Sequence, residues 1–382
     1  MLGHFDKLNV ALLWIRKMVF RLILALMILA FLNGCSNFGY YTQAVFGQME
    51  LLSARRGLAD VVSDKSVPEK VKARIHLAQE ILKFAEEEIG LPVDSTFSTY
   101  ADIGRPYVVW NVFVAKPYSI KLETFCFPVA GCVGYKGFFD RNDARKFSEE
   151  MQKSGFDTFM GGVAAYSSLG WFSDPLLNTF IYRSDEGLAA LIFHELAHKI
   201  MYVKDDTEFN ESFATAVERY ALQKWLGSRH QNLAYDKYIE GQQRQAEVIE
   251  LILRVRDKFE LLYAERSYGE GSFEEAGYKQ KHDDKSSPLI ALNKSDALAL
   301  LRKDYQVLRD AWVEGNEFEF WMKNDINNAK LGAIGAYQGW VSNLTHLLEN
   351  SENFDAFILR AKALGELAPS AREIALLKES AK

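Results

Sequence analysis

Cysteine and histidine are scarce in this chain, and basic residues are not in excess. Its 382 residues include three cysteines and seven histidines, and 45 basic residues against 51 acidic ones give a net charge of -6. Three cysteines do not supply enough neighbouring ligands for a cysteine metal site, and an acidic chain has no electrostatic reason to bind nucleic acid. We also find no internal repeat and no glycine-rich phosphate cradle. Nucleic acid is therefore excluded as an expected partner.

The residues that are present have the composition of an ordinary globular protein. Hydrophobic residues make up 48% of the chain and charged residues 25%. This length can form one large domain or two ordinary ones. We expect a signal segment (1–34) and one domain (35–382), with helical parts over 35–95 and 231–382 around a sheet-containing part over 96–230. The expected class is α+β, mostly helical with a modest sheet; no oligomeric state is predicted.

The N-terminus has the features of a secretory signal. Arg16, Lys17 and Arg21 precede the apolar run LILALMILAF, which leads to LNGC, ending at Cys35. A charged start before a short apolar core is typical of such signals. The alternative is an uncleaved transmembrane anchor, but the run is shorter than the roughly 20 apolar residues that span a bilayer comfortably. Either interpretation carries the body of the protein out of the cytoplasm.

The segment LNGC resembles a lipobox, the processing site of bacterial lipoproteins. The resemblance implies cleavage before Cys35, lipid on its thiol and amine, and a mature protein that begins there. Ser36 is similar to the residue that follows the cysteine in outer-membrane sorting signals. We therefore expect a periplasm-facing protein of the cell envelope, tethered to a membrane by lipid, with the outer membrane favoured.

The other two cysteines stand close together in the segment CFPVAGC. An oxidising compartment favours disulfides, and two cysteines around a proline and a glycine can close a small loop. We predict a disulfide between Cys126 and Cys132.

Hydrophobic spacing gives a coarse order of helices and strands. β-branched and aromatic runs broken by proline and glycine predict short strands over 100–137, and a Gly/Lys/Asp-rich stretch over 269–287 predicts a surface loop. Apolar residues at helical spacing predict the helices. These helices are 68–88, 141–154, one capped by Asp185, one from Asp206 or Thr207 to Gly227, 236–266, and further helices toward the C-terminus.

Residues 191–218, LIFHELAHKIMYVKDDTEFNESFATAVE, contain two of the seven histidines. Positions four apart lie above one another on a helix, so His194 and His198 can direct their imidazoles at one metal ion. Imidazole suits zinc, and a catalytic zinc site needs a third protein ligand and an open position for water, whose pKa falls to about 7. Glu195, one step round the helix, can accept a proton from that water. The alternative is a chance motif with two core histidines.

Three later glutamates are candidates for the third ligand. If the two helices pack antiparallel, His198 falls opposite Glu211, whereas Glu218 lies about a turn beyond His194 at about 1.5 Å per residue. Glu208 lies off that face. We predict Glu211 as the ligand and Glu218, on the same face, as a hydrogen-bond acceptor behind a ligand or a partner for a substrate amine.

The pattern His194-Glu195-x-x-His198 followed by NESFA (210–214) resembles the gluzincin metallopeptidases. The stretches WNVFVAKPYSIKLETFCFPVAGCVGYKGFFD, AAYSSLGWFSDPLLNTF, FHELAHKIMYVKDDTEFNESFATAVE and NNAKLGAIGAY resemble, in that order, a bacterial family of predicted aminopeptidases that often carry lipoprotein signals. The resemblance implies a zincin-like fold, zinc as cofactor and Glu211 as third ligand. The gap from His198 to Glu211 is shorter than in better-known gluzincins, which leaves Glu218 as an alternative ligand.

The resemblance also implies two further parts of the site. Attack on an amide builds negative charge that needs a stabilising donor, and a tyrosine or histidine often serves in relatives. Tyr337 and Tyr166 are the candidates, with core or surface roles as the alternative. Zincin folds commonly pair an edge strand with extended peptide, and residues 162–169 are the candidate, with an ordinary core strand as the alternative.

Three functions are compatible with these residues. The first is a zinc aminopeptidase acting on peptides, which needs a carboxylate for the substrate's ammonium group; Glu218 and Asp174 are the candidates. The second is a zinc endopeptidase of the cell envelope. The third is a catalytically silent lipoprotein scaffold with a structural zinc site. We favour the first.

Overall fold

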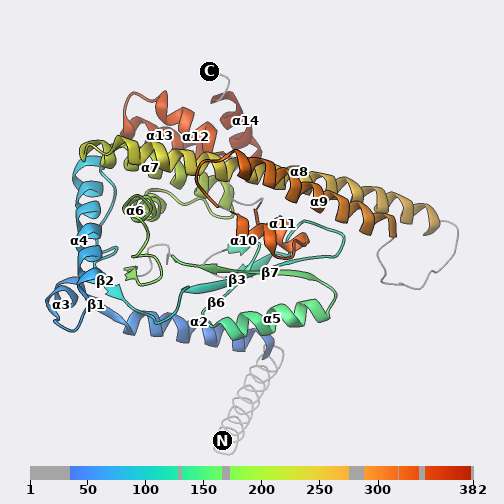
Figure 1. Ribbon diagram of the computed structural model, residues 1–382, viewed down its shortest axis with the longest axis horizontal. Coiled ribbons are helices and arrows are strands. Elements are labelled where there is room, and N and C mark those ends of the chain that lie inside the picture. The colour runs from blue at the N-terminus through green and yellow to red at the C-terminus, as the bar shows by residue number, and fades with distance from the viewer. Residues whose placement is uncertain are drawn as a thin grey trace, which may run out of the picture.

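The computed structural model describes residues 35–127, 131–165, 173–274, 288–316, 318–334 and 340–379. Helices dominate these residues and surround small sheets (Figure 1), so the expected α+β class is confirmed. The helices are α2 (Cys35–Ser53), α3 (Leu58–Ser63), α4 (Glu69–Phe84) with the π-helix η1 (Ala85–Ile89), α5 (Arg141–Lys153), α6 (Asp185–Ile200), α7 (Thr207–Ser228), α8 (Asn232–Glu274), α9 (Pro288–Ala311), α10 (Glu319–Lys323), α11 (Asn328–Ile334), α12 (Val341–Glu349), α13 (Phe354–Gly365) and α14 (Pro369–Glu379).

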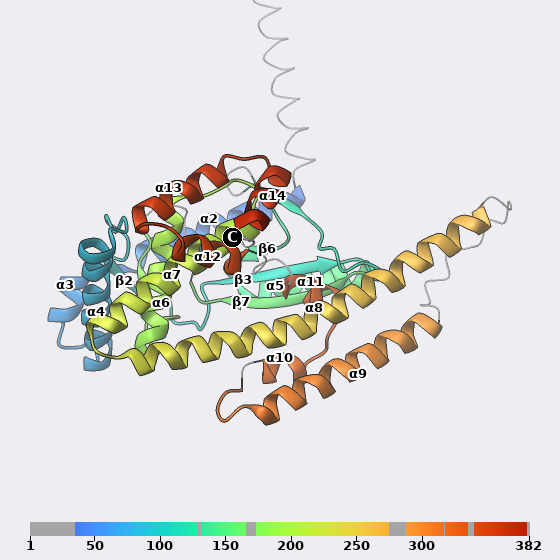
Figure 2. The same cartoon turned by 90° about the horizontal axis from the view of Figure 1, so that it is seen from above.

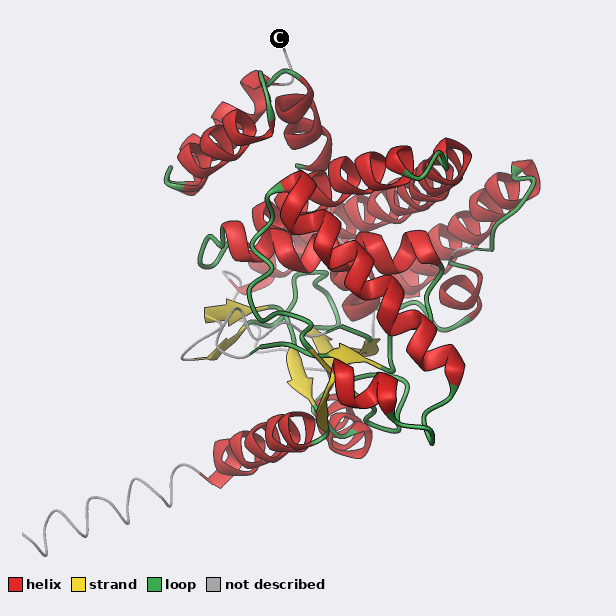
Figure 3. Ribbon diagram, turned by 90° about the vertical axis from the view of Figure 1, so that its left-hand side faces the viewer, coloured by secondary structure: helices red, strands yellow, loops and turns green. Residues whose placement is uncertain are grey.

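The strands lie in the middle of the molecule, with helices on either side (Figure 3). In the central sheet, of order β6-β3-β7, β3 is antiparallel to both neighbours. A second sheet has the order β1-β2-β8, and β4 and β5 form a hairpin. The strands are β1 (Arg55–Gly57), β2 (Thr99–Ala101), β3 (Val109–Ala115), β4 (Phe125–Phe127), β5 (Gly131–Val133), β6 (Lys136–Phe138), β7 (Asp157–Val163) and β8 (Leu176–Leu177).

Strand β3 is covered by helices on both faces because successive side chains of a strand point to opposite sides. Val112 packs in one apolar cluster with Ala144 of α5. Phe113 and Ala115 pack in another with Ala329 of α11. The alternation of β3 therefore places α5 and α11 on opposite faces of the central sheet.

Helices α6 and α7 lie in the largest apolar core, together with α4 and the second sheet. Ser184 caps α6 by accepting a hydrogen bond from the backbone N–H of Gly187 at 3.1 Å. The predicted cap at Asp185 was therefore wrong by one residue. Asp206 caps α7 by accepting from the N–H of Phe209 at 3.0 Å, which confirms the predicted start of that helix.

Helices α8 and α9 form a long hairpin that extends beyond the sheets (Figure 2). Helix α8 continues to Glu274, so the predicted loop was wrong over residues 269–274. The rest of that predicted loop, 275–287, lies outside the described part of the chain. Among the helices that the structure describes, none has the length and apolarity needed to cross a membrane.

A buried asparagine joins this hairpin to the central sheet. The side chain of Asn328 donates to the carbonyl oxygens of Lys116 and Pro117 at 3.0 and 2.7 Å, and accepts the hydroxyl proton of Tyr263 at 2.7 Å. Asn328 is completely buried, and buried amide groups need such partners. Asn328 thus holds the C-terminal half of α8 against the loop that follows β3.

Candidate metal centre

A second buried asparagine fixes the turn between α6 and α7. Asn210, which is 2% exposed, accepts a hydrogen bond from the N–H of Val203 at 2.8 Å and donates to the Val203 carbonyl at 2.7 Å. Asp205 in the turn has a φ of 62°, a left-handed conformation that aspartate adopts more readily than most residues. These features return the chain so that α7 packs along α6.

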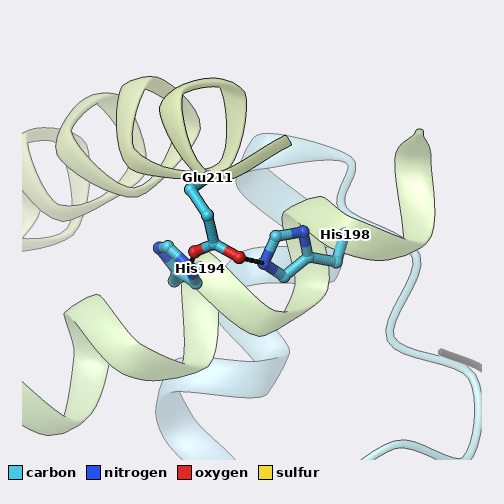
Figure 4. A group of neighbouring side chains, drawn as sticks. All are labelled: His194, His198 and Glu211. Atoms are coloured by element: carbon cyan, nitrogen blue, oxygen red, sulfur yellow. Dashed lines mark hydrogen bonds and ion pairs between the residues drawn. The ribbon is translucent and has the colours of Figure 1, made fainter. Parts of the chain in front are cut away.

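Two imidazoles of α6 and one carboxylate of α7 converge on a single point (Figure 4). Nε2 of His194 lies 3.3 Å from Oε2 of Glu211, and Nε2 of His198 lies 3.8 Å from its Oε1. The two imidazole rings are nearly perpendicular, at 81°, with centroids 4.9 Å apart. One ligand atom from each residue lies within 4.8 Å of the others. The structure brings together the three residues predicted as ligands.

These separations fit a divalent metal ion. Zinc binds imidazole nitrogen and carboxylate oxygen at about 2.0–2.2 Å, so two ligand atoms of a tetrahedral site lie roughly 3.4 Å apart. The separations of 3.3 and 3.8 Å, measured to the two oxygens of Glu211, are of this order, and one ligand atom per residue lies within 4.8 Å of the others. Two imidazoles and a carboxylate also suit zinc and similar metals. His194, His198 and Glu211 could therefore hold a metal ion, with a fourth tetrahedral position left for water or substrate.

Glu218 lies at the other nitrogen of His194. Its Oε2 is 3.0 Å from Nδ1 of His194, and because an ionised carboxylate only accepts hydrogen bonds, Nδ1 carries the proton. This contact leaves Nε2 facing Glu211. Glu218 therefore lies behind His194 as the expected hydrogen-bond acceptor, and it is not one of the three residues whose ligand atoms converge.

Tyr238 of α8 extends this chain of hydrogen bonds. Its hydroxyl donates to Oε1 of Glu218, so both oxygens of Glu218 have protein partners. Acceptors behind a metal-ligating histidine fix its tautomer and ring orientation. Sequence analysis did not find Tyr238, because one tyrosine in a strongly charged helix carries no motif.

The two imidazoles differ in charge in the metal-free protein. Burial lowers the pKa of His194, but hydrogen bonds with Glu211 and Glu218 outweigh burial and raise that pKa to about 10. Burial and the neighbouring charge of His194 lower the pKa of His198 to about 4. His194 is therefore charged and His198 neutral near pH 7, so metal binding at His194 must release its Nε2 proton.

Glu195 lies on α6, between the two histidine ligands in sequence. The pKa of its carboxyl is raised to about 7. Burial is the main cause; the charge of His194 opposes it, whereas the negative charges of Glu211 and Asp174 add to it. A proton affinity near neutrality suits a group that accepts and returns a proton. Two carboxylates, those of Glu211 and Asp174, therefore contribute negative charge near Glu195.

The chain matches a known family over nearly all of its described length. A family model with the description "Putative aminopeptidase" matches residues 39–376. The chain belongs to this family. Its coarse function is accordingly that of a peptidase, and the match includes both helices of the candidate metal centre. Comparisons with curated proteins and with solved structures found no match.

Some predicted parts of the site in this family member lie outside the described residues, including Tyr166 and Tyr337. The candidate peptide-binding strand, 162–169, is described as far as residue 165. Its first two residues end β7, which lies at one edge of the described central sheet. Val163 packs against the largest apolar core, which also contains residues of α6.

The predicted disulfide between Cys126 and Cys132 is confirmed and closes the β4–β5 hairpin. This hairpin contacts the turn between the two metal-centre helices, where Oδ1 of Asp205 accepts a hydrogen bond from the N–H of Cys132 at 3.2 Å. Gly131 has a φ of 72°, and a Cβ at this position would lie 2.4 Å from the same Asp205 oxygen. The close approach of hairpin and turn therefore requires glycine at 131.

Proposed function

We propose that the protein is a zinc-dependent aminopeptidase of the cell envelope. The observation that carries this proposal is the approach of His194, His198 and Glu211 ligand atoms to within 4.8 Å of one another, in a chain of the aminopeptidase family. Bound zinc supplies a Lewis acid that polarises an amide carbonyl and lowers the pKa of water. Three protein ligands favour a catalytic site, because structural zinc sites are closed by four.

Glu195 is the proposed general base. Its carboxylate accepts a proton from the attacking water and returns it to the nitrogen of the leaving amine as the C–N bond breaks. Burial raises the pKa of this carboxyl to about 7 in the metal-free protein. Glu218 holds the ring of His194 and is itself held by Tyr238.

An aminopeptidase also needs a negative group for the substrate's free ammonium. Glu218 is poorly suited to this role, because its two oxygens already accept hydrogen bonds from His194 and Tyr238. The negative charge of Asp174 contributes to the raised pKa of Glu195. Asp174 precedes β8, and its backbone carbonyl accepts a hydrogen bond from the N–H of Phe97 at 2.8 Å. We therefore propose that the Asp174 carboxylate binds the ammonium group of the substrate.

Zinc content and turnover of a Glu195→Gln variant test the proposal. The variant keeps the size of the side chain and the three metal ligands, so we expect unchanged zinc content and a turnover of free-amine peptides lower by about 10²–10⁴-fold. Glu186→Gln, in the first turn of the same helix, is the matched control and should retain both. Undiminished turnover in Glu195→Gln, or folded wild-type protein that takes up no metal, would contradict the proposal.

A panel of free and N-acetylated peptides tests the exopeptidase assignment separately. An aminopeptidase releases the first residue of free peptides and leaves acetylated peptides intact. Internal cleavage of acetylated peptides, with no advantage from a free amine, would replace this assignment by the endopeptidase alternative.

We further propose that the protein faces the periplasm and is tethered to a membrane, with the outer membrane favoured, through lipid on Cys35. The charged start, the apolar run and the LNGC segment support this localisation. Mass spectrometry of the N-terminal peptide from membrane-extracted protein should show a lipid-modified Cys35 as its first residue. A peptide that still begins at Met1 would contradict the cleavage.

A further inference from the structure

Helix α2 packs on the rest of the protein through one face. Tyr40 contacts the ring of Phe138, with centroids 5.5 Å apart, and Oε1 of Gln43 accepts the N–H of Phe139 at 3.1 Å. A Cβ added at Gly47 would lie 2.2 Å from the Phe139 ring, so the helix backbone itself touches that ring. Residues 40, 43 and 47 follow helical spacing and define the inner face of α2.

The opposite face of α2 is apolar and exposed. Tyr41, Val45, Phe46 and Met49 have exposed fractions of 43%, 57%, 67% and 58%. Positions 41, 45 and 49 are four apart and lie in one row along the helix, with Phe46 beside them. We call these four residues the outer face of α2. A surface helix usually carries polar and charged side chains in this place.

Charge is nearly absent from the whole helix. Glu50 is the one charged residue among the 19 residues of α2, and its carboxylate pairs with Arg105 at 2.9 Å. The outer face consequently has no charged side chain of its own. Aromatic and aliphatic side chains on one face of a helix can bury their apolar groups in the interface of a bilayer.

The sequence before α2 indicates which surface covers the outer face. Helix α2 begins at Cys35, which follows the apolar run of the N-terminal signal. A lipid on Cys35 and an uncleaved anchor would both bring a bilayer to this end of the helix. Tyr41 follows Cys35 by six positions, which corresponds to roughly 9 Å along a helix. The outer face therefore starts within reach of the membrane in either case.

We propose that the outer face of α2 lies on the phospholipid bilayer and orients the peptidase on it. This inference rests on the localisation proposed above and adds a second contact to the tether. Figure 1 shows α2 along the lower edge of the molecule and α12, α13 and α14 at the opposite edge. The C-terminal helices would then point away from the bilayer, and one tether with one apolar face would restrict rotation of the metal centre relative to the membrane.

Photocrosslinking of the full chain tests this contact. A photoreactive phenylalanine analogue, p-benzoylphenylalanine, replaces Phe46 in one sample and Phe320 of α10 in the matched control. Phe320 is more exposed, at 83%, and does not belong to α2. After reconstitution into vesicles of phosphatidylethanolamine and phosphatidylglycerol, we expect lipid adducts on position 46 and none on position 320.

Other outcomes would overturn the contact. Adducts with another protein at position 46 would assign the outer face to a protein partner, and equal lipid labelling at both positions would show that the tethered protein tumbles freely. Absence of any adduct in vesicle-bound protein would also reject it while leaving the tether intact. Failure of the wild-type chain to bind vesicles would instead reject the proposed localisation, so the two failures are distinguishable.

Discussion

The Nδ1 atom of His194 lies 3.0 Å from Oε2 of Glu218, across the interface between α6 and α7. This contact decides which nitrogen of His194 is available to a metal, because the protonated Nδ1 leaves Nε2 to face Glu211. It also connects the metal centre to α8, because Tyr238 donates to the other oxygen of Glu218. Helix α8 thus supports a site to which it contributes no ligand.

We expect Glu218→Gln to lower zinc affinity by about 10–100-fold, because a neutral amide neither fixes the His194 ring as well nor raises its basicity. Competition with a chromogenic chelator measures the dissociation constant. Tyr238→Phe is the companion variant, and its zinc affinity should fall less, since this change leaves the Glu218 carboxylate in place. If Glu218 were the third ligand, zinc binding would be lost in Glu218→Gln and spared in Glu211→Gln.

Asn210→Ala should destabilise the protein, because it removes both hydrogen bonds between the buried Asn210 side chain and the part-buried backbone of Val203. The Val203 carbonyl still accepts the N–H of Asp206 at 3.3 Å, and each lost hydrogen bond costs about 0.5–1.5 kcal/mol. Chemical denaturation of metal-free protein measures the loss. Asn142→Ala is the control: Asn142 is exposed on α5, and a change there should cost less than about 0.5 kcal/mol. An equal loss of stability in the two variants would contradict the proposal that Asn210 stabilises the turn between α6 and α7.

Asp174→Asn should weaken binding of substrates with a free N-terminus, because it removes the charge that we assign to the ammonium. A hydrogen bond to a charged group contributes about 1.5–3 kcal/mol, which corresponds to a roughly 10–100-fold increase in KM. Glu186→Gln, in the first turn of α6, is the control variant and should leave the KM for these substrates unchanged. A fall in turnover with KM unchanged would place Asp174 in support of Glu195 instead.

Metal-free protein should lose stability as the pH rises from about 7 to 9. The folded-state pKa of His194 is raised to about 10 from a usual value of 6.5, so its contribution is fully present below pH 6.5 and is lost on approach to pH 10. One proton retained by the folded state gives a slope of at most about 1.4 kcal/mol per pH unit. Unfolding by urea in the presence of a chelator measures this slope.

Glu218→Gln is the control for the pH experiment, because it removes one of the two carboxylates that hydrogen-bond His194 and raise its pKa, and it should flatten the slope. Glu195, with a pKa of about 7, still titrates at pH 7 and gives a slope of the same sign, so the slope between pH 8 and 9 is the part assigned to His194. His198, with a pKa of about 4, does not titrate in this range. A stability that is level from pH 7 to 9 in wild-type protein would show that His194 is not held between two carboxylates.

Local sequence determined the parts of this protein that depend on neighbouring residues. Helical spacing placed His194, Glu195 and His198 on one helix, and the next helix with its Asp206 cap followed from capping chemistry. The disulfide of Cys126 and Cys132 followed from their separation and from the turn-forming residues between them. These features require only contacts within a few turns of chain, so their pattern is visible in the residue order.

Tertiary structure alone decided the contacts between distant segments. Glu218 reaches His194 and is held by Tyr238 because α7 lies between α6 and α8 in the packed core. Helical spacing placed Glu218 on the face of Glu211, but it could not show which ring nitrogen Glu218 contacts or that Tyr238 holds its other oxygen. The exposed face of α2 is likewise defined by tertiary contacts, because Gly47 and Tyr40 pack against Phe139 and Phe138 on the opposite face of the helix. Packing selects which side of an element is covered, and residue order specifies only the elements that can pack.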